Sequence, residues 1–344
     1  MKKVWVISAL VVALVIVTVA VSLVAGAFRC PAVDFKPVFF SDCNYNNYNL
    51  MGNTIDYRYG RFAWVDSSRL GSVLSVQSEN GDVSYIRGYS DITQIQLAEE
   101  GIYFLADLRL YLKLYTEEAS VELIAEEVAS FIATEEYVFY ETHVVDTPSL
   151  IKPSGHTNLM CLNKKSRETM LFAEDVNFYC VNDKEICIKT TYSASDVVAY
   201  TDEGTYTKGV LNDGVYISVQ HCGEFLAYYD DTSLNYIGED TEGLNAILLC
   251  DDGHQYANVA GICDKGQFYV SYHAVRYPAV EPVEIDSPSN GLWRINPKTQ
   301  EQELLCEMTY DELYCFGIHG LFGIKDGEIY KISMQYGTAS KISQ

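Results

Sequence analysis

The sequence predicts an all-β protein, a β-propeller of about seven four-stranded blades that follows one N-terminal transmembrane helix. Three observations carry this prediction. They are an uncharged apolar N-terminal stretch, a two-hairpin unit that recurs along the rest of the chain, and an abundance of Tyr (27) and Phe (14), which favour sheet. We divide the 344 residues into a membrane anchor or uncleaved signal at 1–29, a linker at 30–44 and a propeller at 45–344.

The N-terminal stretch, residues 4–28, carries no charged side chain. A helix of this length is roughly 37 Å long and exceeds the roughly 30 Å hydrocarbon core of a bilayer. Lys2 and Lys3 precede it, and the positive-inside rule places them in the cytoplasm and the propeller outside. The alternative is secretion after cleavage near Ala27, because Ala25-Gly26-Ala27 fits a signal-peptidase site. The apolar run is longer than the roughly 7–15 residues of most signals, so we expect a single-pass cell-membrane protein.

The net charge of the chain is -23, from 24 basic and 47 acidic side chains. The first 29 residues hold three basic groups and no acid, so the rest has 21 basic against 47 acidic groups, or -26. Such a chain repels phosphate backbones, which excludes nucleic acid as a partner. Most of the excess acid falls in turns, where it favours solubility and protects sheet edges. The exported part lacks an Asn-x-Ser/Thr acceptor, and this favours a bacterial source.

The first half of the repeated unit is a strand, a polar turn and an aromatic-rich strand. Its seven copies are 55–64, 95–104, 131–140, 178–187, 210–216, 261–269 and 317–322. Asn212-Asp213-Gly214 is one of the polar turns, and such residues supply the positive φ that a hairpin turn needs. This half therefore predicts a β-hairpin in each copy.

The second half is an apolar alternation, a polar loop and another apolar pair, which predicts a second hairpin. Its copies are 73–86, 111–124, 160–171, 197–206, 225–237, 292–305 and 329–342. The first-hairpin turns recur about every 43 residues, the length of a propeller blade. Residues 246–250 also fit an outer strand, which leaves six or eight blades open. We expect a loop at 275–290, and the one stretch of helix-forming composition, 117–129, fits two strands equally well.

The repeats resemble the bacterial extracytoplasmic propellers of unknown function that are similar to the YWTD propeller of low-density-lipoprotein-receptor-related proteins. Residues 62–66 (FAWVD), 103–107 (YFLAD) and 138–142 (VFYET) stand at the Tyr-Trp-Thr-Asp-like strand, and 292–296 (LWRIN) at the outer hairpin. The strand-terminal aspartate is kept only at Asp66 and Asp107. The resemblance covers most of 45–342 and implies a propeller fold and an exported setting. It implies no chemistry, because propellers host both binding proteins and enzymes.

Motifs for catalysis or metal binding are missing from the sequence. There is no Gly-x-Ser-x-Gly elbow, and none of the six histidines forms an i,i+4 pair or a His-Glu-x-x-His motif. The paired acids do not follow the spacing of a calcium loop, and we interpret them as solvated turns. These pairs are 99–100, 135–136, 202–203, 230–231, 239–240 and 251–252. We therefore predict no catalytic, cofactor-binding or metal-binding residues.

Ten cysteines in an exported protein suggest disulfides. No Cys-x-x-Cys pair occurs, so neither a zinc ribbon nor a thioredoxin-like site is indicated. A hairpin that turns at 182–184 would place Cys180 and Cys187 opposite each other, and cross-strand neighbours lie about 4.5–5.5 Å apart, within disulfide reach. We predict a possible disulfide between Cys180 and Cys187; the alternative is buried thiols in strands.

The aromatic side chains are expected to pack between blades, with a ring of exposed tyrosines on one face as the alternative. The residues concerned are Tyr103, Phe104, Phe139, Tyr140, Tyr216, Phe268 and Tyr269. We expect a non-enzymatic binding or scaffold module whose loops recognise a protein, peptide or glycan ligand, because propeller loops form a rigid rim. The alternative is a hydrolase or lyase that acts on an extracellular polymer through carboxylates and histidine at the central channel.

Overall fold

The computed structural model describes most of the region expected to form the propeller. The described ranges are 53–68, 71–116, 120–143, 157–181, 185–190, 196–201, 204–210, 220–222, 225–229, 233–237, 245–248, 257–264, 267–276, 283–284, 288, 290–296, 298–315 and 320–342. The anchor and the linker predicted from the sequence lie outside these ranges. Within them, no helix is long and apolar enough to cross a membrane.

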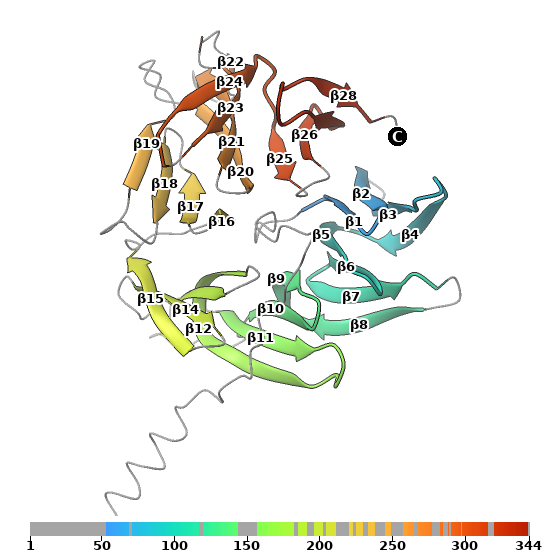
Figure 1. The fold of residues 1–344 in the computed structure, drawn as a ribbon. Helices are drawn as coiled ribbons and strands as arrows, with labels where there is room; N and C mark the ends of the chain where they lie inside the picture. The colour runs from blue at the N-terminus through green and yellow to red at the C-terminus, as the bar shows by residue number, and fades with distance from the viewer. Residues whose placement is uncertain are drawn as a thin grey trace, which may run out of the picture.

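The described part of the chain folds into antiparallel sheets arranged around a common centre, which is the architecture of a β-propeller (Figure 1). The all-β prediction is confirmed. The first sheet contains β1 (Ile55–Arg58), β2 (Arg61–Ser68), β3 (Gly71–Gln77) and β4 (Val83–Tyr89). The second contains β5 (Ile92–Leu97), β6 (Gly101–Ala106), β7 (Arg109–Leu114) and β8 (Val121–Glu126). In each, the first strand lies toward the centre of the ring and the last toward its rim.

The third sheet has seven strands in the order β9 to β15. They are β9 (Val128–Ala133), β10 (Tyr137–His143), β11 (Thr157–Asn163), β12 (Thr169–Val181), β13 (Ile186–Thr190), β14 (Asp196–Thr201) and β15 (Gly204–Val210). The 13-residue β12 pairs with β11 through its first half and with β13 through its second half. Asp175 lies between the halves with a φ of 54°, and we call this bend the crease.

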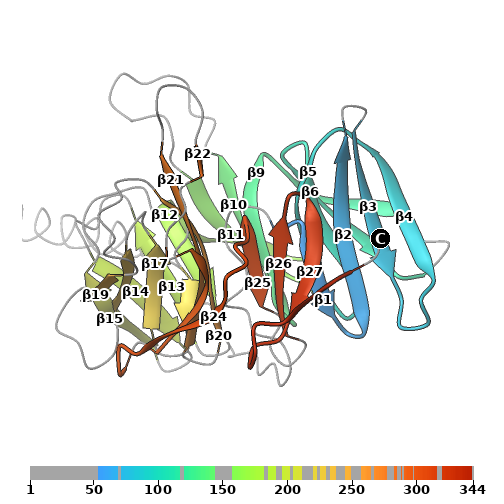
Figure 2. The ribbon, with the colours of Figure 1, turned by 90° about the horizontal axis from the view of Figure 1, so that it is seen from above.

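Three further sheets complete the ring. One contains β16 (Gln220–Cys222), β17 (Phe225–Tyr229), β18 (Ser233–Ile237) and β19 (Asn245–Leu248). The next contains β20 (Ala257–Asp264), β21 (Gln267–Arg276), β22 (Val283–Glu284), β23 (Gly291–Ile295) and β24 (Gln302–Cys306). The last contains β25 (Glu312–Cys315), β26 (Leu321–Lys325), β27 (Glu328–Ile332) and β28 (Ala339–Lys341). Seen from above, the strands stand side by side as upright ribbons (Figure 2).

Local turn chemistry sets the hairpins. Tyr59 and Gly60 link β1 to β2 with φ values of 50° and 67°, which is the positive φ at both central residues that a type I′ turn requires. The resulting register pairs Ile55 with Trp64, as expected for the 55–64 hairpin. Within the stretch at 117–129, the described residues 121–126 and 128–129 lie in the strands β8 and β9 rather than in a helix.

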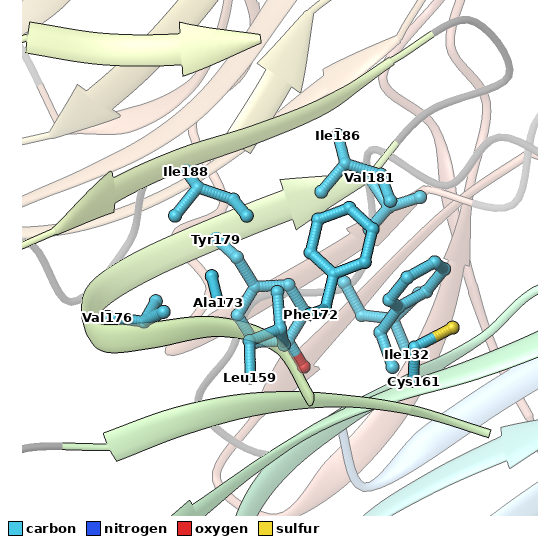
Figure 3. Close-up of a cluster of buried hydrophobic side chains, with 11 residues drawn as sticks. Ile132, Leu159, Cys161, Phe172, Ala173, Val176, Tyr179, Val181, Ile186 and Ile188 are labelled. Carbon is cyan, nitrogen blue, oxygen red and sulfur yellow. The ribbon is translucent and has the colours of Figure 1, made fainter. Parts of the chain in front are cut away.

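The hydrophobic core is divided into clusters that lie between neighbouring sheets. Tyr103 from β6 packs with Phe131 from β9 in one cluster, and Phe104 lies with strands of the first sheet in another. At the crease, a third cluster fills the space between the two halves of the seven-stranded sheet, with Tyr179 in its midst (Figure 3). The expected packing between sheets is found for four of the aromatic residues, Tyr103, Phe104, Tyr140 and Tyr269. Phe139 packs within the seven-stranded sheet, Phe268 is buried, and Tyr216 lies outside the described residues.

One sequence prediction is wrong in detail, and another lies almost wholly outside the described residues. Of the hairpin expected at 210–216, only Val210 is described, as the last residue of β15. The next described hairpin is formed by β16 and β17. The outer strand of the β16–β19 sheet is β19 (Asn245–Leu248), which overlaps the segment 246–250 that the sequence offered as an alternative outer strand. The insertion at 275–290 is not wholly a loop, since β21 runs on to Arg276 and pairs there with β22.

Candidate binding surface

Polar side chains on the inner strands are used to join one sheet to the next. The Gln96 Nε2 on β5 donates to the Ala133 carbonyl, and the Ala133 N–H donates to Gln96 Oε1 at 2.8 Å. On β1, Asp56 Oδ2 accepts the Leu97 N–H of β5 at 2.7 Å, and Asp56 Oδ1 is 3.2 Å from Arg58 Nε. The inner edges of β5 and β9 are thus closed by side chains from the preceding sheet.

One face of the ring carries a group of aromatic and charged side chains. In each sheet, the turn between the first and second strands lies on the same face of the ring as the turn between the third and fourth strands, because consecutive strands are antiparallel. Six residues lie in or next to these turns of the first three sheets, and we call them the turn-face cluster: Tyr59, Arg61, Glu100, Tyr103, Tyr115 and Lys164.

Lys164 links the second and third sheets within this cluster. Its ammonium lies 2.7 Å from Glu100 Oε1 and 5.0 Å from the centre of the Tyr103 ring. The Tyr103 hydroxyl donates to the same Glu100 oxygen at 2.9 Å. Burial lowers the pKa of Lys164, and the carboxylate of Glu100 opposes this shift. The side chains of Lys164 and Glu100 remain 12% and 35% exposed, so the pair is open to solvent on one side.

Arg61 links the first and second sheets in the same way. Its guanidinium stacks 4.0 Å from the centre of the Tyr115 ring. Burial raises the pKa of Tyr115, with the Arg61 charge acting against the shift. The Tyr115 hydroxyl is buried and has no hydrogen-bond partner within the described ranges. Buried hydroxyls are nearly always hydrogen-bonded, so this one is an exception, and the Arg61 guanidinium stacked on the ring is the charged group of the pair.

The cluster contains residue types that are common at binding interfaces. Tyr and Arg are the residue types that most often dominate binding energy at interfaces, and aromatic rings also stack on apolar faces of ligands. In the described part of the chain, no group of three or more His, Cys, Asp or Glu side chains is placed to hold a metal ion. The buried carboxyl groups of Asp56 and Glu141 are engaged in hydrogen bonds between strands.

The cysteine pair predicted from the sequence is brought together. Cys180 on β12 and Cys187 on β13 are direct partners in the register, and both are buried. The geometry is compatible with both expectations, the disulfide and the buried thiols in strands, and the disulfide stays a prediction.

Sequence patterns located part of the turn-face cluster. The paired acids at 99–100 and 135–136 lie in turns as expected, while the other four acidic pairs fall wholly outside the described residues. The interpretation of 99–100 as a merely solvated turn missed the ion pair of Glu100 with Lys164. Their separation of 64 residues gives no signal in one sequence. A ring of exposed tyrosines is not formed by the described residues, where Tyr59, Tyr85 and Tyr336 are exposed on separate turns and strands.

No protein-family model matches the sequence, and no curated protein is a detectable relative. Solved structures are similar in shape. Saccharomyces cerevisiae Sqt1 matches with a TM-score of 0.51, 8% identity and 88% coverage of each chain. A puromycin hydrolase matches with a TM-score of 0.55, 12% identity and coverage of 90% of this chain and 56% of that one. An acylaminoacyl peptidase from Pyrococcus horikoshii matches with a TM-score of 0.54, 11% identity and coverage of 88% of this chain and 54% of that one.

These likenesses show the fold alone, a β-propeller. This chain spans little more than half the length of the two hydrolases. What those proteins act on is therefore not carried over to this chain.

Proposed function

We propose that this protein is a membrane-anchored, extracytoplasmic β-propeller that acts as a non-enzymatic binding or scaffold module for a protein, peptide or glycan ligand. The observation that carries the proposal is the turn-face cluster, where the Arg61 guanidinium stacks on the Tyr115 ring and the partly exposed Lys164 and Glu100 side chains form an ion pair. The inner strands give this face a rigid base, since the edges of β5 and β9 are closed by Asp56, Gln94 and Gln96.

The proposal includes seven blades. In this count β12 serves twice, as the outer strand of one blade and the inner strand of the next, which fits its pairing with both β11 and β13. A bacterial source and a likeness to the YWTD-type propellers are supported by the sequence features described above.

A binding assay with two matched arginine variants tests the function. Arg61 stacks on Tyr115 in the turn-face cluster, whereas Arg87 stacks on Tyr85, 4.9 Å from its ring centre, on the outer strand β4. We expect ligands from peptide and glycan arrays to lose affinity at least tenfold with Arg61→Ala and to keep it with Arg87→Ala. Equal affinity for both variants and the wild type, or turnover of any array ligand, would overturn the proposal.

The anchor is tested by fractionation and intact-mass measurement of the expressed protein. A mass beginning at Met1 in the membrane fraction supports the anchor and the outside location that Lys2 and Lys3 favour. Soluble protein that begins at Phe28 refutes it and supports secretion.

A further inference from the structure

A buried carboxyl group, that of Glu141, lies at the crease of the seven-stranded sheet. The Ser130 hydroxyl of β9 donates to Glu141 Oε2 at 2.8 Å and is 3.4 Å from the Tyr179 hydroxyl of β12. The Thr157 hydroxyl of β11 lies 3.4 Å from Glu141 Oε1 and 2.8 Å from the Val176 carbonyl of β12. The five oxygen-bearing groups form a continuous chain across both halves of the sheet.

The surroundings of this chain are apolar. Tyr179 is fully buried among Leu159, Val176 and Ile188 (Figure 3), and Glu141 is 8% exposed. A charge in such a place is stable only with enough hydrogen-bond donors or an opposite charge. The hydrogen atoms available to Glu141 therefore decide its charge.

Each hydroxyl has one hydrogen to give. The Tyr179 hydroxyl donates its hydrogen to the Ser130 oxygen, and the Ser130 hydroxyl donates its hydrogen to Glu141 Oε2. The hydrogen of Thr157 has a carbonyl acceptor, Val176, at 2.8 Å, which is closer than Glu141 Oε1 at 3.4 Å. The contact between Thr157 and Glu141 Oε1 then lacks a hydrogen unless the carboxyl group supplies it.

We propose that Glu141 carries a proton in the folded protein and donates it to Thr157, so that the carboxyl group is a pH-sensitive latch between the two halves of the seven-stranded sheet. The hydrogens then run in one direction, from Tyr179 through Ser130, Glu141 and Thr157 to the Val176 carbonyl. Loss of the proton forces the Thr157 hydrogen to serve either the carboxylate or the carbonyl. One of these two buried acceptors at the crease is then left without its partner.

Among the described residues, no opposite charge acts on the Glu141 carboxyl group. β9 and β11 present the hydroxyls of Ser130 and Thr157, and β12 presents Tyr179 as the titratable group that faces Glu141. Burial raises the pKa of Tyr179 well above its ordinary value, and the charge of Glu141 raises it further, so Tyr179 remains a donor. Burial likewise raises the pKa of Glu141, although the hydrogen bonds from Ser130 and Thr157 oppose this shift.

The sign of the pH effect follows from this direction. A carboxyl group with a raised folded pKa binds more protons in the native state than in the unfolded state. Its contribution to stability is complete below its ordinary pKa of 4.5 and is lost as the pH rises through the folded pKa.

The test compares the full chain with Glu141→Gln across about pH 4 to about pH 9. A glutamine amide accepts from Ser130 and donates to Thr157 at every pH. We expect nearly equal Tm values at the acidic end and a progressively lower Tm of the wild type than of Glu141→Gln as the pH rises. Glu122→Gln is the control, because Glu122 is exposed and pairs with Arg167. The Tm of Glu122→Gln should not rise relative to that of the wild type as the pH rises. Parallel curves for the wild type and Glu141→Gln would overturn the latch.

A second measurement needs no variant. Hydrogen exchange of the wild type should show that protection of the β11 and β12 amides falls with rising pH relative to that of the β5 and β6 amides. A constant ratio of these protection factors over the same range would contradict the proposal, whether or not Glu141→Gln folds.

Discussion

Gln94 and Phe131 are joined by two hydrogen bonds across the boundary between the second and third sheets. Gln94 Nε2 donates to the Phe131 carbonyl at 2.6 Å, and the Phe131 N–H donates to Gln94 Oε1 at 3.3 Å. Gln96 makes the same pair of bonds with Ala133. Two carboxamides therefore take the place of a neighbouring strand along the inner edge of β9. Closed edges do not invite pairing with another chain.

We predict that Gln96→Ala destabilises the protein by about 2 to 4 kcal/mol, because it leaves the buried N–H and carbonyl of Ala133 without partners, at about 1–3 kcal/mol for each. Urea unfolding followed by tryptophan fluorescence measures the change. Gln77→Ala is the matched control, since Gln77 makes one exposed 3.5 Å bond to Gly81; its cost should stay below about 0.5 kcal/mol. Equal effects of the two variants would show that the edge closure contributes nothing.

The buried ion pair of Arg58 and Asp56 gives a second prediction. Both side chains are almost fully buried, with Arg58 Nε 3.2 Å from Asp56 Oδ1. We expect Arg58→Met to lower the free energy of unfolding by about 3–5 kcal/mol above about pH 8, where Asp56 is ionised, because it leaves a buried carboxylate without its counter-charge. The exposed pair of Arg109 and Glu126 is the control, and Arg109→Met should cost less than about 1 kcal/mol.

The pH dependence of Arg58→Met checks the cause. Burial raises the pKa of Asp56 to about 8 from 3.8, while the Leu97 N–H favours the ionised form. The folded protein thus holds this proton more tightly than the unfolded chain, and the stability contributed by the group falls as the pH rises from about 4 to about 8. The defect of Arg58→Met should therefore shrink on acidification to about pH 5. A defect that grows on acidification contradicts this account.

Residue patterns foresaw the hairpins but not the contacts between sheets. The 55–64 hairpin was predictable because a Tyr59–Gly60 turn tolerates positive φ and fixes the pairing of Ile55 with Trp64. The 210–216 hairpin lies outside the described residues apart from Val210, so its Asn212-Asp213-Gly214 turn stays a prediction. The described strands that precede and follow it, β15 and β16, belong to different sheets.

The turn-face cluster escaped prediction for a related reason. Arg61 and Tyr115 are 54 residues apart, and each stands in an ordinary strand or turn sequence. Their stacking depends on how one sheet is rotated against the next, which a local pattern does not encode. The composition did predict that the molecule would consist of sheets, because Tyr, Phe, Val and Ile favour strands throughout the chain.

The cysteine pair of β12 and β13 gives a third prediction. Cys180 and Cys187 are register partners, and oxidation in an exported protein should join them. Intact mass should fall by two hydrogens upon oxidation, with Cys180 and Cys187 recovered in one cross-linked peptide. The bridge should add about 2.5 kcal/mol through its short loop. Cys161 is the control, because burial raises the pKa of its thiol to about 12 and should keep it unreactive.

The junction of the first and last sheets gives the fourth prediction. No strand pairing among the described residues joins β25–β28 to β1–β4, and the ring is closed there by side chains. The Phe322 ring stacks on Phe62 with centroids 5.9 Å apart and on Tyr57 at 6.1 Å. A 3.5 Å hydrogen bond between Thr54 and Tyr314 accompanies them.

We expect Phe322→Ala to cost about 3–5 kcal/mol and to open the ring at this junction before the rest of the protein unfolds. Hydrogen exchange under mildly denaturing conditions should then rise first in β1 and β26, because no shared strand holds these two sheets together. Phe172→Ala is the matched control, since Phe172 is equally buried but lies at the crease, where β12 runs through both halves of the sheet. That variant should lose a similar amount of stability without early exchange in β1 and β26. Uniform exchange across all strands in Phe322→Ala would mean that the ring unfolds as one unit and that the junction is no weaker than the crease.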